Sequence, residues 1–224
     1  PPAWREAFLA AERSLRDGVA VDLAPLRTYP LYPYLRYQDL ARRLSELPAD
    51  EVREFLRDHA DSPLAVRLRG AWLRQLVAVR RWNDYLRDFT PTRDAELDCW
   101  QRQALLATGQ DEAALRDFAA LWLRGAALPT ACDPVIAAWR ARGEPTPERL
   151  WQRFAMAMEN NNPKLARALR AAMPAADQAL ADAWLGIAEN PSLTLSAGLL
   201  NPNDPRAAVI LSDGLERWGQ RNAL

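Results

Sequence analysis

The chain has 224 residues, and 29 Lys and Arg balance 29 Asp and Glu, so its formal net charge at pH 7 is zero. Hydrophobic residues make up 49% and charged residues 26%, which is typical of a globular protein and excludes wholesale disorder. Zero net charge argues against a dedicated nucleic-acid or anionic-membrane binder, whose affinity comes mainly from excess positive charge.

Apolar residues recur at helical spacing along nearly the whole chain. Trp4, Phe8, Ala11 and Leu15 predict a first helix, which Gly18 ends. We find no convincing strand-like alternation, and no apolar run approaches the roughly 18–20 residues that span a bilayer. Comparable helical stripes follow in residues 64–76, 115–122 and 151–158.

A capping side chain followed by proline marks several expected helix starts. The cap oxygen accepts a hydrogen bond from the first turn, and proline suits the first position because its missing N–H would be unpaired anyway. The pattern predicts helices of about 10–16 residues, joined by short connections that make consecutive helices antiparallel neighbours. The pairs are Ser62-Pro63, Asp133-Pro134, Thr146-Pro147, Asn162-Pro163 and Asp204-Pro205.

Residues 97–123 show the expected repeating unit. A helix, a turn at Gly109 and a second helix opening on Ala113 and Ala114 resemble one tetratricopeptide-like hairpin. Regular tetratricopeptide spacing does not persist, so we predict an irregular solenoid. The expected fold class is all-α, an α–α superhelix of short antiparallel hairpins forming a single domain over residues 1–224.

The ionisable residues form no recognisable catalytic motif. His59 is the only histidine and lies near the end of a charged helical segment, where it suits the negative end of the helix dipole. One His and two Cys cannot build a Cys/His zinc site, and no glycine-rich phosphate motif occurs. Carboxylates are plentiful, but none stands out as a catalytic acid. We expect no catalytic residue, no cofactor and no metal site.

The two cysteines leave two interpretations open. Cys99 opens one expected helix, and Cys132 directly precedes the Asp133-Pro134 pair. A disulfide closing this loop would contribute about 3–4 kcal/mol in the chain-entropy model. On spacing alone, two unrelated buried thiols fit equally well.

A stretch rich in proline and tyrosine follows the first helix. Pro30 and Pro33 favour entry into a helix, on which Tyr34, Tyr37 and Ala41 share one face. Core packing, with the hydroxyls reaching a partner, is the interpretation we favour. A platform on which sugars stack is the alternative.

The same stretch also resembles a known family. Tyr29-Pro30-Leu31-Tyr32-Pro33-Tyr34-Leu35-Arg36-Tyr37 resembles the YPLYPYLEY signature of soluble lytic transglycosylases, with Arg36 where that pattern often has Glu. The likeness extends over most of the chain at matching intervals. It continues through Arg81-Trp82, Cys99, residues 121–123, 131–140 and 155–158, and the turn at 188–191.

This resemblance implies a fold and an activity. The family's N-terminal region is a U-shaped superhelix that closes a ring with a linker and a lysozyme-like catalytic domain. The periplasmic parent enzymes cleave the MurNAc–GlcNAc bond without water, leaving a 1,6-anhydro end, and use a glutamate in a Glu-Ser motif. No Glu here precedes Ser, so we expect a part of the U-shaped domain without the catalytic domain. The family also has a disulfide at the positions matched by Cys99 and Cys132.

The resemblance favours a non-catalytic domain that acts as a scaffold and guides glycan strands or stem peptides. Its expected partners are peptidoglycan and the enzyme's own catalytic domain, with no nucleic acid, and its expected location is the periplasm after removal of a signal peptide. Arg36, Arg67 and Arg74 are candidates for binding stem-peptide carboxylates. The alternative is a tetratricopeptide-like module whose concave face binds a protein partner.

Overall fold

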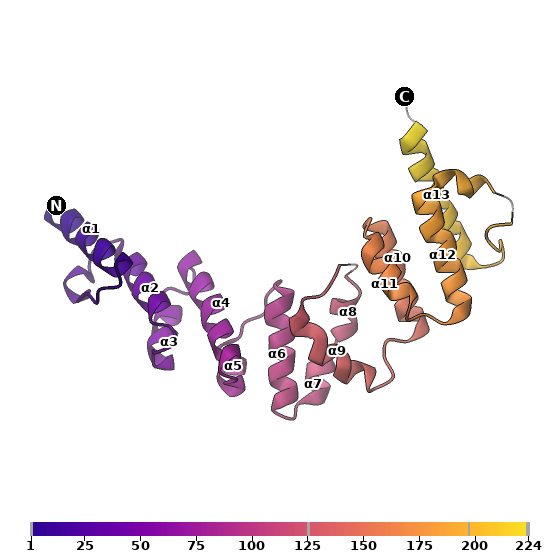
Figure 1. Cartoon of the computed structure of the whole chain (residues 1–224). Helices are drawn as coiled ribbons and strands as arrows, with labels where there is room; N and C mark the ends of the chain where they lie inside the picture. Colours follow the sequence, from indigo (N-terminus) through magenta and orange to yellow (C-terminus); the bar gives the residue numbers. More distant parts are fainter. Residues whose placement is uncertain (1, 125, 197, 223–224) are drawn as a thin grey trace. The chain divides into compact units, whose positions relative to one another are not determined.

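Figure 1 shows a computed structural model of the chain, which describes residues 2–124, 126–196 and 198–222. These residues form thirteen α-helices and three 3₁₀-helices and contain no β-strand, which confirms the all-α fold class. Among them, no helix is both long enough and apolar enough to cross a membrane. The chain divides into two compact units, residues 1–111 and 112–224.

Unit 1 is a series of helical hairpins. Its elements are α1 (Pro2–Arg16), η1 (Ala24–Leu26), α2 (Tyr32–Arg42), α3 (Ala49–Asp58), α4 (Pro63–Ala78), α5 (Trp82–Asp88) and α6 (Ala95–Ala107). Consecutive helices pack together as α1 with α2, α3 with α4, α4 with α5 and α5 with α6 (Figure 1). Helix α4 also contacts α2 and α6, so it is the centre of this unit.

Unit 2 begins within α7 and repeats the hairpin pattern. Its elements are α7 (Asp111–Leu115), α8 (Phe118–Trp122), η2 (Thr130–Cys132), α9 (Asp133–Arg140), α10 (Pro147–Glu159), α11 (Pro163–Arg170), α12 (Ala175–Glu189), η3 (Pro191–Leu195) and α13 (Pro205–Asn222). Helix α11 packs against α10 and α12, and α13 packs against α12 and η3. The predicted arrangement of short helical hairpins is therefore present in both units.

Four of the five cap-and-proline pairs begin a helix with the expected side-chain cap. The side-chain oxygens of Ser62, Thr146 and Asn162 each accept a backbone N–H of the first turn, at 3.2 or 3.3 Å. Asp204 caps α13 in the same way, at 2.9 Å. Asp133 is different: it is the first residue of α9, and the residue before it makes no side-chain cap bond.

The expected hairpin over residues 97–123 is more broken than predicted. Its first helix ends as expected at a turn in which Gly109 has a φ of +76°. The second helix is interrupted after Leu115, because Asp117 adopts a left-handed conformation with a φ of +55°. A left-handed residue cannot continue a right-handed helix, so two short helices replace the single one expected.

Several tryptophans lie in the cores of the hairpins. Trp72, Trp122 and Trp139 are 2%, 3% and 5% exposed, whereas Trp100 and Trp151 are only partly buried. In unit 1, the main core extends from α2 to α6, and a smaller cluster lies beneath α1 and η1. Burial of these large rings supplies much of the stabilisation of each hairpin.

The cysteines form a disulfide. Neither is free, both are disulfide-bonded, and the chain contains only two, so Cys99 is bonded to Cys132. The pairing implied by the family resemblance is confirmed, and the reading of two unrelated thiols is wrong. Both residues are fully buried, which keeps the bond away from solvent.

Candidate functional site

A cavity of about 630 Å³ in unit 1 is the candidate functional site. It lies between the segment 21–27, helix α2 and helix α3. Asp22 shapes the first wall, because its Oδ1 accepts the backbone N–H of Ala24 at 2.9 Å at the start of η1. The second wall is helix α2, which has a proline in its first turn. A volume of this size accommodates a small organic ligand.

A salt-bridge network between Arg36, Asp39, Arg43 and Glu51 lines part of the cavity. Arg43 donates to Asp39 from Nε at 2.9 Å and from Nη2 at 2.6 Å. Arg36 bridges Asp39 and Glu51, at 3.4 and 3.1 Å. Burial raises the pKa of Asp39, but Arg43, Arg36 and Arg42 outweigh that effect and leave the pKa below its ordinary value. Asp39 is therefore ionised at neutral pH, and its partners are held in place.

Aromatic side chains line another part of the cavity. Tyr32 contributes from α2, and Phe55 and His59 contribute from α3. The rings of Phe55 and His59 lie 4.6 Å apart between centroids. His59 directly follows the last helical residue of α3, as expected from its position in the sequence. The site therefore combines charged groups with flat apolar surfaces.

The structure separates the three arginines proposed as ligand contacts. Arg36 lines the cavity and is already paired there. Arg74, on α4, is paired with Asp94 at 3.4 Å and Glu96 at 3.3 Å. Arg67, also on α4, is exposed and makes no ion pair within the described part of the chain. Only one of the three therefore belongs to this cavity.

The tyrosines of the signature stretch have different environments. Tyr29 lies against two aromatic rings of α1, with centroids 5.5 and 6.0 Å away. Tyr32 and Tyr37 are partly buried against the two cores of unit 1. Tyr34 is 52% exposed, so core packing does not describe it. Within the described residues, none of these four hydroxyls makes the hydrogen bond that we expected.

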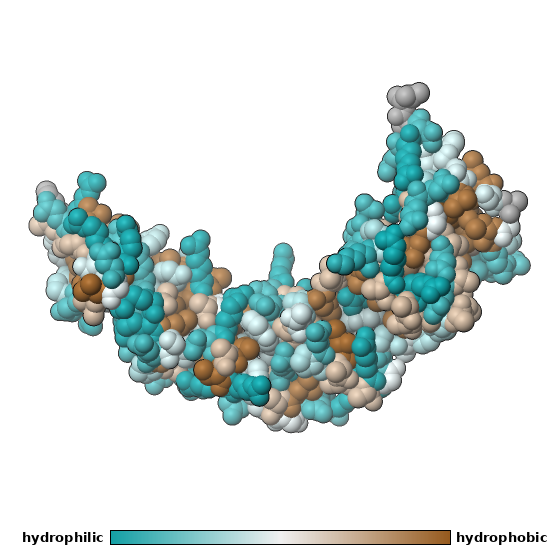
Figure 2. Space-filling model, viewed as in Figure 1, coloured by the Kyte–Doolittle hydropathy of each residue, from teal (hydrophilic) through white to brown (hydrophobic). Residues whose placement is uncertain are grey.

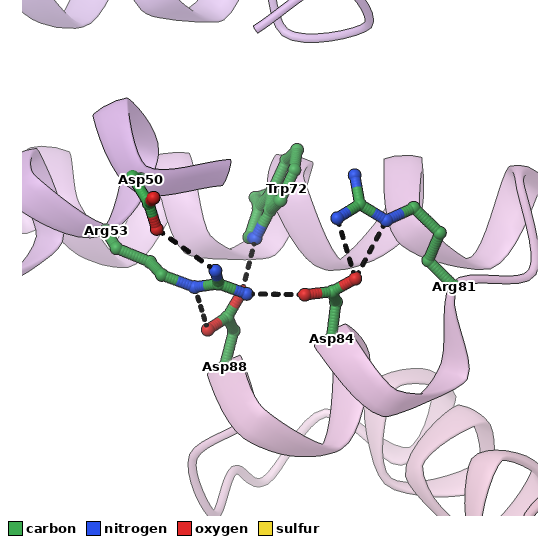
Figure 3. Close-up of polar contacts among 6 residues, drawn as sticks. All are labelled: Asp50, Arg53, Trp72, Arg81, Asp84 and Asp88. Atoms are coloured by element: carbon green, nitrogen blue, oxygen red, sulfur yellow. Dashed lines mark hydrogen bonds and ion pairs between the residues drawn. The ribbon is translucent and has the colours of Figure 1, made fainter. Parts of the chain in front are cut away.

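A second polar cluster joins α3, α4 and α5 (Figure 3). Arg53 on α3 donates to Asp84 at 2.7 Å and to Asp88 at 2.8 Å, both on α5. Trp72 on α4 donates its indole N–H to Asp88 at 2.8 Å, and Arg81 pairs with Asp84. In Figure 3 the carboxylates point toward their protein partners, so this cluster holds helices together. Sequence reasoning missed it because its partners lie on separate helices.

An apolar groove of about 490 Å³ lies in unit 2, beside η3 and the start of α13. Leu195, Leu199 and Leu211 line it and are 65%, 39% and 36% exposed. Figure 2 shows apolar side chains gathered over the segment that follows α12. No group of three or more His, Cys, Asp or Glu among the described residues could hold a metal ion.

Known proteins similar to this chain are soluble lytic murein transglycosylases. The protein of that name from Escherichia coli strain K12 is 35% identical over 182 residues, which cover 80% of this chain and 28% of the relative. The Salmonella typhimurium protein gives the same identity and coverage over 181 residues.

Solved structures agree. The 70 kDa soluble lytic transglycosylase from Escherichia coli matches 99% of this chain and 37% of its own, with a TM-score of 0.83 and 28% identity. This chain is similar in sequence and in fold to the soluble lytic murein transglycosylases. An inactive mutant of the lytic transglycosylase Slt from Pseudomonas aeruginosa gives a TM-score of 0.82 and 30% identity, covering 96% of this chain and 36% of that one.

The chain spans a little over a quarter of the length of its curated lytic transglycosylase relatives. A family model described as "Cucumovirus coat protein" also matches residues 110–188. That match covers less than half of the chain, and it lies inside the region over which the lytic transglycosylase structures align, so it does not show a second family.

Proposed function

We propose that this chain is a superhelical, non-catalytic part of a soluble lytic transglycosylase that cleaves peptidoglycan in the periplasm. The observation that carries this proposal is 35% identity to murein transglycosylases over 80% of the chain, together with the shared fold. The complete enzyme would cleave the MurNAc–GlcNAc bond and leave a 1,6-anhydro product.

The chain's contribution would be mechanical and positional. The disulfide and the Arg53 cluster restrain the helices, which suits a scaffold. Exposed guanidinium groups would guide glycan strands by binding stem-peptide carboxylates. Arg67 fits this role best because its guanidinium has no ion pair in the described structure, whereas Arg36 and Arg74 would have to exchange acidic partners.

The test compares this 224-residue chain with the complete product of its gene on purified peptidoglycan sacculi. We expect the complete product to release anhydro-muropeptides and this chain alone to release none. Release by this chain, free of contaminating enzyme, would contradict a non-catalytic role. If neither protein releases anhydro-muropeptides, the proposal that this chain is part of a lytic enzyme is contradicted.

A second experiment tests the guiding role. Soluble muropeptides are titrated into the wild type and into Arg67→Ala, at low and moderate salt. Because an exposed ion pair contributes about 0.2–1 kcal/mol, we expect weaker binding by the variant and weaker binding at higher salt. No difference at either salt concentration would remove Arg67 from the proposal.

The alternative function is a protein-interaction module similar to tetratricopeptide domains. The apolar groove of unit 2 favours it, because exposed leucines around a groove are typical of protein-binding surfaces. An inactive complete gene product that binds a protein partner through this groove would favour the alternative.

A further inference from the structure

The charges around the 630 Å³ cavity of unit 1 do not all have partners inside the protein. The salt-bridge network is internally neutralised, because Arg36 and Arg43 are bonded to Asp39 and Glu51. Those four groups therefore have little charge left for a ligand. The charge that a ligand would encounter is therefore determined by the other side chains that line the cavity.

One side of the cavity is acidic. Glu54 and Asp58 lie one turn apart on α3 and both line the cavity. Glu54 is exposed and has no hydrogen bond or ion pair among the described residues. Among the described residues, the Asp58 side chain pairs only with Arg57, at 3.3 Å, in an exposed ion pair of little strength. Both carboxylates lie in the last turns of α3, where the negative end of the helix dipole adds attraction for a cation.

Among the described residues, the other side carries one available cation, together with Asp22, whose Oδ1 accepts the backbone N–H of Ala24. Arg27 directly follows η1, lines the cavity and is exposed. Its guanidinium has no hydrogen bond or ion pair within the described structure. A guanidinium with free N–H groups suits a carboxylate, which it can bind through two parallel hydrogen bonds. The aromatic surface of Tyr32, Phe55 and His59 completes the lining.

This lining is selective between ligand classes. A phosphate-rich ligand would meet one free cation and several carboxylates, so repulsion disfavours it. A metal ion needs converging ligands, and the described residues contain no such group. A ligand with an ammonium group at one end and a carboxylate at the other matches both sides.

We propose that this cavity binds an amphoteric ligand, with its ammonium group at Glu54 and Asp58 and its carboxylate at Arg27. Peptidoglycan stem peptides that contain a diamino acid carry both groups, and free amino acids carry them too. The choice of a stem peptide as the source rests on the proposed function. The amphoteric chemistry rests on the cavity alone.

The test is a titration of the isotope-labelled chain followed by NMR. The probes are L-alanyl-γ-D-glutamyl-meso-diaminopimelate, the same peptide with its amines acetylated, free L-lysine, and a peptide-free GlcNAc–MurNAc disaccharide. We expect the first peptide to bind at millimolar concentration and to shift the amide signals of segment 21–27 and of the end of α3. Acetylation should abolish this response.

Glu54→Gln and Arg27→Gln should each weaken binding by about two- to five-fold, as expected for exposed ion pairs. Their matched controls are Glu6→Gln and Arg5→Gln, exposed residues of α1 that do not line the cavity, and these should bind like the wild type. Circular dichroism and an unperturbed NMR spectrum would show that each variant is folded.

Each alternative outcome has a definite meaning. Equal binding of the acetylated peptide, binding of the disaccharide alone, or no shift at the cavity would overturn the amphoteric site. Binding of L-lysine as tight as that of the peptide, with the same loss in Glu54→Gln, would support the site and overturn peptidoglycan as its source. The complete gene product could release anhydro-muropeptides while this chain shows no NMR shift at the cavity. That result would overturn this inference and leave the proposed function standing.

Discussion

Arg53 on α3 and Asp88 on α5 form a two-point ion pair, with Nε 2.8 Å from Oδ1 and Nη2 3.1 Å from Oδ2. The Asp88 side chain is only 6% exposed, and its Oδ2 also accepts the indole N–H of Trp72 on α4. One nearly buried carboxylate therefore joins three consecutive helices. Hydrogen bonds from this cluster also raise the pKa of Arg53 above its usual value.

Replacing Asp88 should destabilise unit 1. Asp88→Asn leaves Arg53 with one fewer charged partner in a largely buried place, so we expect the free energy of unfolding to fall by about 2 kcal/mol. Urea denaturation followed by tryptophan fluorescence measures this. Asp58→Asn is the control, because its pair with Arg57 is exposed and should contribute less than about 1 kcal/mol. Equal effects of the two substitutions would contradict the structural role of Asp88.

The Asp39 network should make stability depend on acidic pH. The pKa of Asp39 in the folded protein lies below its ordinary value because of its arginine partners, although burial alone would raise it. A lowered native pKa stabilises the fold above the unfolded-state pKa, and this stabilisation is lost as pH falls through the native value. Wild type should therefore exceed Asp39→Asn in stability at pH 6, and the difference should shrink steadily below about pH 4. A difference that is constant from pH 6 to about pH 2 would contradict this linkage.

Two glycines of α13 should respond oppositely to alanine. A Cβ on Gly214 would lie 2.7 Å from Cγ2 of Ile187 on α12 and closer still to Oγ1 of Thr194 on η3. We expect Gly214→Ala to lower stability by about 1–3 kcal/mol through overpacking. Gly219 faces open space, so Gly219→Ala should raise stability by about 0.5–1 kcal/mol. Thermal denaturation compares the two, and a shift of the same sign in both would refute the close approach at Gly214.

The disulfide should resist reduction in the native state. Because Cys99 and Cys132 are bonded to each other, a thiol reagent should find no free thiol in denatured, unreduced protein made in an oxidising compartment. Because both cysteines are fully buried in the folded protein, a reductant should cleave the bond only after a denaturant has unfolded the chain. Replacing both cysteines by serine should cost about 3–4 kcal/mol in the chain-entropy model. Complete labelling of both thiols in periplasmic material would contradict the bond.

The helices were predictable from sequence because their signals are local. The cap bonds of Ser62, Thr146 and Asn162 span two or three residues, so the sequence alone places the starts of α4, α10 and α11. The break at Asp117 was not predictable, because nothing in that segment distinguishes a left-handed residue from a helical one. Its neighbours read equally well as one continuous helix.

The sequence by itself determined the helical class and the length of the helical hairpins, and its resemblance to the soluble lytic transglycosylases implied the disulfide. The candidate cavity depended on tertiary structure, since Arg27 and Glu54 face the same space only after the segment following α1 folds against α3. The same is true of Arg53 and Asp88, which lie 35 positions apart. Helix starts depend on neighbours along the chain, whereas charge pairing and cavities depend on which helices pack together. One stripe of apolar residues does not specify its packing partner.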